Sequence, residues 1–171
     1  MSAAMRPPRL TSGVTTPYSG IGVSTPILRR ERTDGSPLMT PRETFLRLVQ
    51  GISAGRWDEL ADLYAEDAVV EQPFAVPPAP SRIEGRTTVA AHFARAGEGP
   101  LRFRVRDGAV VHETADPEVI VTEFTYDGEV TTTGAVFTMS NVQVLRVRDG
   151  LIVSSRDYHD HAALGRALGA S

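Results

Sequence analysis

The most reactive group of side chains lies near the end of the chain, in residues 156–161, which read Arg-Asp-Tyr-His-Asp-His. An apolar run precedes them and predicts a strand that carries the group into the fold. Because side chains on a strand alternate between its faces, we expect Val153, Ser155, Asp157 and His159 to share one face. A carboxylate and an imidazole two residues apart on one buried face can form an acid/base pair. The segment therefore predicts catalytic roles for Asp157 and His159, without identifying a reaction.

A structural role for Asp157 is the competing interpretation. Its carboxylate could pair with Arg156, with Arg146 or Arg148, or with a backbone amide, and merely fix the last strand in place. The two interpretations differ in what surrounds the carboxylate, which is either an apolar cavity or a guanidinium or amide partner.

The last two residues of the reactive segment are expected at the start of a terminal helix. Asp160 and His161 would then have a capping or solvated role. The spacing of His159 and His161 also occurs in metal sites, but no third ligand is evident, so we expect no metal.

Composition limits the classes of function. The 171 residues suffice for one domain plus a tail. The net charge of −3 lacks the basic excess that is typical of nucleic-acid-binding proteins. The chain has no cysteine, which removes disulfides, thiol catalysis and thiolate metal sites. No apolar run is long enough to span a membrane, and the first residues lack the apolar core of a secretory signal. We therefore expect a cytoplasmic protein with no membrane partner.

The N-terminal residues and the rest of the chain differ in composition. Residues 1–38 are rich in Pro, Ser, Thr, Gly and Arg without a hydrophobic period, which predicts a disordered tail. Residues 39–171 form the predicted domain. Its first helix begins with Thr40 as N-cap, Pro41 at the first helical position and Glu43 completing a capping box.

Apolar spacing predicts helices in the first half of the domain. The first helix ends at Gly55, a second runs from Trp57 to Tyr64, and a third covers Thr87 to Ala96. A short strand over 67–74 lies between the last two.

From Leu101 onward the apolar period changes to two, which predicts strands. Asp-Gly pairs at 107–108, 127–128 and 149–150 are turn or bulge signals between them. The expected strands cover about 101–114, 118–127, 130–147 and 151–159. Helices followed by an antiparallel meander indicate an α+β fold with helices on one face of the sheet.

This order resembles the nuclear transport factor 2-like superfamily over about residues 41–168. The resemblance rests on residues 63–74, Gly85-Arg86 and the closing segment 156–160. It implies a cone-shaped, curved antiparallel sheet whose concave side is packed by the N-terminal helices around an apolar pocket. It also implies a homodimer that binds an apolar small molecule and needs no cofactor.

Two enzyme groups of this superfamily match the chain poorly. Ketosteroid isomerases carry an Asp base before the Pro-Phe of the first strand, where this chain has Gln72, and their oxyanion-hole acids fall at Leu48 and Gln143. Limonene-type epoxide hydrolases use an Arg and an Asp on a middle strand, which fall near Phe124 and Tyr126 here.

SnoaL-like polyketide cyclases match better, because their acid/base Asp lies on the final strand where this chain has Asp157. The leading hypothesis is a cofactor-free cyclase or isomerase that acts on an apolar, oxygenated small molecule. A secondary-metabolite pathway would suit such a reaction. An epoxide hydrolase or epoxide-opening cyclase that also uses Asp157 is one alternative. A non-catalytic binding or dimerisation module is another.

Further side chains are predicted to contact the substrate. Neutral amides among apolar residues orient ligands, and either Glu71 or Gln72 faces the pocket, depending on a bulge before Pro73. The predicted substrate-binding residues are Tyr64, Glu71, Gln72, His92, Phe124, Tyr126, Asn141, Gln143 and Ser155.

Overall fold

The computed structural model describes residues 37–169, so nearly all of the predicted tail, residues 1–36, lies outside the described residues. Helix α1 spans Pro41–Ser53 and begins with the predicted capping box. The hydroxyl of Thr40 accepts a hydrogen bond from the backbone nitrogen of Glu43, at 3.2 Å. The Glu43 carboxylate accepts one from the backbone nitrogen of Thr40, at 2.8 Å. Gly55 follows the helix with a φ of 69°, as its predicted end requires.

The second predicted helix is shorter and tighter than expected. It is a 3-10 helix, η1, over Trp57–Leu63, and strand β1 begins directly after it, at Tyr64. Tyr64 is therefore a strand residue rather than a helical one. Its ring lies 5.9 Å from that of Phe93, which belongs to helix α2, Arg86–Glu98.

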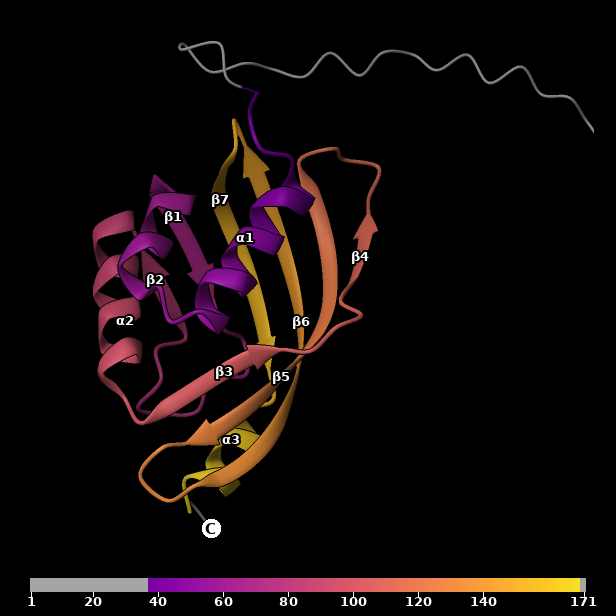
Figure 1. The fold of residues 1–171 in the computed structure, drawn as a ribbon. Coiled ribbons are helices and arrows are strands. Elements are labelled where there is room, and N and C mark those ends of the chain that lie inside the picture. Colours follow the sequence, from indigo (N-terminus) through magenta and orange to yellow (C-terminus); the bar gives the residue numbers. More distant parts are fainter. Residues whose placement is uncertain (1–36, 170–171) are drawn as a thin grey trace, which may run out of the picture.

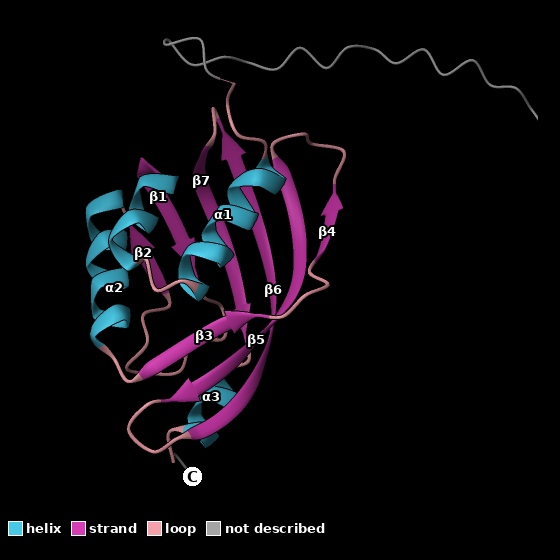
Figure 2. Ribbon diagram, viewed as in Figure 1, coloured by secondary structure: helices cyan, strands magenta, loops and turns pink. Residues whose placement is uncertain are grey.

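Seven strands form one curved sheet, in the order β2-β1-β7-β6-β5-β3, with β4 also paired to β5 (Figures 1 and 2). Neighbouring strands are antiparallel except β1 and β7, which run parallel. The fold is the predicted α+β arrangement with a curved, mostly antiparallel sheet. The strands are β1 Tyr64–Glu71, β2 Arg82–Glu84, β3 Leu101–Val105, β4 Val110–Glu113, β5 Val119–Val130, β6 Ala135–Arg148 and β7 Leu151–His159.

One of the predicted turns is a strand instead. Gly128 lies inside β5, paired with Phe137 of β6, and the hairpin turn comes after Val130. The ring of Phe137 packs directly over Gly128, where any Cβ would collide with it. The glycine thus marks a close approach of side chain to backbone and not a change of direction. The pair Asp149-Gly150 does form a tight turn, with φ values of 50° and 79°.

Strand β7 contains a bulge that interrupts the predicted alternation of side chains between the two faces. Ile152 pairs with Val147 and Ser154 pairs with Arg146, so Val153 is an extra residue opposite two consecutive residues of β6. As a result Ile152, expected on the outer face, is fully buried in the core, and Val153 does not keep the phase of Asp157. Beyond the bulge the prediction holds, because Ser155 and Asp157 are buried on the inner face.

The helices cover the inner, concave side of the sheet. Helix α1 packs against β3, β5 and β6, and α2 packs against β1 and β2 (Figure 1). The ring of Phe45 on α1 contacts Phe124 on β5 edge to face, with centroids 5.2 Å apart. Helix α3, His161–Ala167, follows β7 and packs against β6. The carboxylate of Asp160 caps α3 by accepting a hydrogen bond from the backbone nitrogen of Ala163. Of the helices between residues 37 and 169, none has the length and apolar content that a membrane crossing requires.

Candidate functional site

A cavity of about 310 Å³ lies between the helices and the inner face of the sheet. Its wall is mostly apolar, with a small group of polar side chains on β6, β7 and the start of α3, as is typical of small-molecule sites. The lining residues are Leu48, Val49, Ile52, Trp57, Tyr64, Val70, Gln72, Ala79, Ile83, Val89, His92, Phe93, Ala96, Leu101, Phe103, Phe124, Tyr126, Met139, Gln143, Asp157, His159, His161 and Leu164.

Asp157 lies in the wall of this cavity and is only 6% exposed. Its Oδ1 accepts a hydrogen bond from Nε2 of Gln143, the residue directly opposite on β6, at 2.7 Å. Burial raises the pKa of Asp157 from 3.8 to about 6, although Gln143, Ser155 and the nearby His92 favour the charged form. Such a carboxyl group can both take and return a proton near neutral pH.

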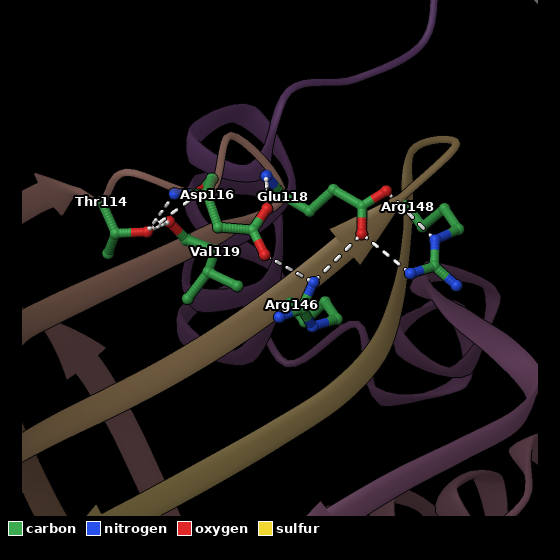
Figure 3. Close-up of polar contacts among 6 residues, drawn as sticks. All are labelled: Thr114, Asp116, Glu118, Val119, Arg146 and Arg148. Atoms are coloured by element: carbon green, nitrogen blue, oxygen red, sulfur yellow. Dashed lines mark hydrogen bonds and ion pairs between the residues drawn. The ribbon is translucent and has the colours of Figure 1, made fainter.

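Two of the arginines that could have neutralised Asp157 bind other carboxylates. Arg146 contacts Asp116 at 2.8 Å and Glu118 at 3.2 Å, and Arg148 contacts Glu118 at 2.9 Å (Figure 3). These ion pairs lock the segment before β5 to the end of β6. Their guanidinium groups therefore stabilise one end of the β5–β6 pair, and the charge of Asp157 is left to amide and hydroxyl groups.

The third arginine fixes Glu71 outside the cavity. The carboxylate of Glu71 contacts Arg156 at 2.8 Å and Arg82 at 2.8 Å, which lowers the pKa of Glu71 chiefly through the hydrogen bond from Arg156. Gln72, the next residue, is buried and lines the cavity. Of the two residues predicted as alternatives, the structure thus places Gln72 at the cavity and Glu71 on the outer face of the sheet.

Asn141 and His159 form a second cross-strand pair, next to Gln143 and Asp157. Nδ2 of Asn141 donates to the backbone oxygen of Met139 at 2.9 Å, and Oδ1 of Asn141 lies 2.7 Å from Nδ1 of His159. His159 lines the cavity, whereas Asn141 is buried behind it and is not part of the cavity wall. Burial lowers the pKa of His159 to about 4, so the imidazole is neutral at pH 7.

Three of the predicted aromatic contacts line the cavity. Phe124 and Tyr126 follow each other on the inner face of β5, with ring centroids 5.3 Å apart, and Tyr64 lies on β1. Burial and the nearby charge of Asp157 raise the pKa of both tyrosines, so their hydroxyl groups stay protonated. The middle strand therefore contributes aromatic rings where a limonene-type enzyme would carry an Arg and an Asp.

His92 and Ser155 occupy different surroundings. His92 lines the cavity from α2, and its pKa is lowered by burial and by the charge of Arg95. Ser155 is buried on the inner face of β7, between the core residue Ile152 and Asp157, and is not part of the cavity wall.

His161 lines the cavity although the sequence predicted a solvated or capping position for it. It is the first residue of α3, and the turn at Asp160 brings its ring to 5.9 Å from that of His159. Its Nε2 is buried and has no hydrogen-bond partner among residues 37–169. Only the density of histidines in this segment could have indicated the position. Within the described residues, no three His, Asp or Glu side chains gather as a metal site would need.

Comparison with known proteins identifies the family of this chain. The sequence model of the SnoaL-like domain matches residues 45–155. An uncharacterised PhzA/B-like protein from Pseudomonas aeruginosa is 37% identical over 124 residues, which cover 72% of this chain and 84% of that protein. The protein YesE from Bacillus subtilis is 35% identical over 117 residues, which cover 67% of this chain and 76% of YesE.

Solved structures show the same fold. The crystal structure of a candidate isomerase from Bacillus subtilis superimposes with a TM-score of 0.71 at 28% identity, covering 76% of this chain and 93% of that one. A candidate polyketide cyclase from Pseudomonas putida gives a TM-score of 0.63 at 20% identity, covering 75% and 98%. The chain belongs to the SnoaL-like family, within the nuclear transport factor 2-like superfamily.

Proposed function

We propose that this protein is a cofactor-free cyclase or isomerase in which Asp157 moves a proton on an apolar, oxygenated small molecule. The observation that supports this most is a single carboxyl group, buried in an apolar cavity and bound to an amide instead of an arginine. A carboxylate paired with a guanidinium would be too weak a base for this chemistry, because its pKa would fall well below neutrality.

The reaction begins at a carbon next to a carbonyl group. The carboxylate of Asp157 takes a proton from this carbon, and the electron pair of the broken C–H bond moves to the carbonyl oxygen, which gives an enolate. In an isomerisation, Asp157 returns the proton to another carbon of the same system. In a cyclisation, the enolate carbon forms a C–C bond to a second carbonyl carbon, whose oxygen takes the proton from Asp157.

The enolate oxygen needs a hydrogen-bond donor that stays protonated. Tyr64 and Tyr126 line the same cavity, and the charge of Asp157 contributes to raising the pKa of both. Their hydroxyl groups are neutral donors across the range of pH in which Asp157 is ionised. We propose that one of them stabilises the enolate, as preorganised donors do where negative charge develops.

Proton exchange provides a test that needs no knowledge of the natural substrate. Tetralone, a bicyclic ketone, is incubated in heavy water with the protein, and the loss of its α-protons is followed by NMR. Asp157→Asn is expected to lower the catalysed exchange by about 100-fold or more, since it removes the only base proposed. The rate should rise with pH through about 6, the pKa of Asp157.

A matched control uses a carboxylate outside the cavity. Asp127 lies on β5 and pairs with Arg106 on the surface, so Asp127→Asn should leave exchange unchanged. Equal exchange by wild type and Asp157→Asn would contradict a role for Asp157 as base. Binding of tetralone without any catalysed exchange would instead favour a binding module.

A further inference from the structure

Four of the polar residues on the inner faces of β6 and β7 form two cross-strand pairs. Gln143 faces Asp157 and Asn141 faces His159, at alternate positions of the same antiparallel register. We call these four residues the polar grid. Each pair is joined by a hydrogen bond of 2.7 Å. The direction of each bond follows from which atoms can donate and which can only accept.

Asn141 determines which nitrogen of His159 carries the proton. A backbone carbonyl only accepts hydrogen bonds, so the amide atom of Asn141 that contacts Met139 O at 2.9 Å must be its NH₂ group. The other amide atom is then the oxygen, which also only accepts. Nδ1 of His159 must therefore donate to it, and in the neutral ring Nε2 carries a lone pair.

The same reasoning applies to Gln143. When Asp157 is ionised its carboxylate only accepts, so the amide atom of Gln143 that contacts it is the NH₂ group. Oε1 of Gln143 is then an acceptor, and this buried atom has no hydrogen-bond partner among the described residues. A buried amide oxygen without a partner is costly, and a ligand that donates to it would remove that cost.

We propose that the polar grid is an acceptor surface, which selects ligands that present a hydroxyl or N–H donor to Gln143 Oε1, beside the second acceptor, His159 Nε2. This deepens the proposed function, since it adds to the substrate a donor group separate from the reacting carbonyl. The same surface disfavours anionic ligands, because the carboxylate of Asp157 lies in the grid and would repel a second negative charge.

The test compares naphthol, naphthyl methyl ether and naphthoate, which share one ring system and differ in the polar group. Binding to the full chain is measured by titration calorimetry at about pH 8, where Asp157 is ionised and naphthol is still largely neutral. Naphthol is expected to bind about tenfold more tightly than the ether, the value of one neutral hydrogen bond, and naphthoate more weakly than either.

Gln143→Met tests the atom responsible. It keeps the length of the side chain and removes the acceptor, so the preference for naphthol over the ether should fall to about twofold or less. Met139→Leu changes the same strand and the same cavity wall without touching a polar group, so the preference should persist. A thermal unfolding curve for each variant verifies that it is folded at the temperature of the titration.

Two outcomes overturn the proposal: equal binding of naphthol and the ether by wild type, or tighter binding of naphthoate. A preference that Gln143→Met leaves intact would also contradict it. The binding preference does not depend on turnover. Preference without proton exchange would refute only the proposed function, and exchange without preference would refute only the acceptor surface.

Discussion

Gln143 and Asp157 are direct partners across β6 and β7, and the Gln143 amide donates a hydrogen bond to the Asp157 carboxylate at 2.7 Å. A neutral amide stabilises a carboxylate much less than an arginine does, because it carries no net charge. Burial therefore outweighs the hydrogen bond and holds the pKa of Asp157 at about 6. The identity of one residue on β6 thus decides whether the carboxyl group on β7 works as a base near neutral pH.

Gln143→Met should raise the pKa of Asp157 further. The substitution removes a donor that favours the charged form and leaves the cause of the raised pKa, burial, in place. We expect the titration midpoint of the Asp157 carboxyl carbon, followed by NMR, to move above its wild-type value of about 6. Met139→Leu should leave the midpoint unchanged. A lower midpoint in Gln143→Met would mean that water replaces the amide as a better donor.

Asp157→Asn should change how stability depends on pH. The pKa of Asp157 is about 6 in the folded protein and 3.8 as an unperturbed group, so the folded state holds this proton more tightly. The stabilisation is complete below pH 3.8 and is lost as pH rises through 6. Relative to wild type, the variant should therefore gain stability between these limits, by up to about 3 kcal/mol for a rise of two pKa units.

Urea unfolding at about pH 4 and about pH 8 measures this difference directly. His159 has the opposite dependence, because its pKa is lowered to about 4, but it is present in both proteins and cancels in the comparison. Asp127→Asn is a control in which the free energy of unfolding should change in the opposite direction. Hydrogen bonding to Arg106 lowers the pKa of Asp127, so the variant should be less stable than wild type at pH values above the normal pKa of Asp. A pH-independent difference for Asp157→Asn would contradict a raised pKa.

Local sequence predicted the elements whose geometry is set by neighbouring residues. The capping box of α1 depends on residues 40–43 alone, and the turn at Asp149-Gly150 on two residues that tolerate a positive φ. The pair Asp127-Gly128 has the same composition but lies within β5, because pairing along all of β6 and the ring of Phe137 decide its conformation. A dipeptide pattern carries no information about such a distant partner.

Parts of the site were beyond sequence reasoning for the same reason. The bulge at Val153 depends on the register between β6 and β7, which no pattern within β7 reveals. The choice between Glu71 and Gln72 is settled by Arg82 and Arg156, which reach Glu71 from two other strands. By contrast, strand alternation correctly placed Asp157 on the same face as Ser155, because the bulge at Val153 comes before both residues.

Asn141→Leu should allow the neutral ring of His159 to adopt both tautomers. Asn141 Oδ1 accepts from Nδ1 of His159, so the wild-type ring should hold its proton on Nδ1. In Asn141→Leu this acceptor is gone, and the ring should become a mixture of both tautomers. The two ring nitrogens of His159 give distinct nitrogen-15 shifts that report the tautomer directly. Identical spectra for wild type and variant would show that Asn141 does not position the ring.

The outer face of the sheet leads to a prediction about assembly. The superfamily resemblance implies a homodimer, and we propose that its two copies pack through the outer faces of β5, β6 and β7. Val142 on β6 is 38% exposed there, beside Tyr158 of β7, with which it is paired. An apolar strip at the centre of a sheet face is the kind of surface that a second copy covers.

Val142→Glu should therefore separate the two copies, because it would bury a charge at the centre of the interface. Light scattering on a size-exclusion column should give twice the chain mass for wild type and one chain mass for the variant. Leu46→Glu is the matched control, since Leu46 is similarly exposed, at 36%, but lies on α1, away from the outer face of the sheet. It should remain dimeric. A single-chain mass for the wild type at every concentration, or a dimer that Val142→Glu leaves intact, would rule out this interface.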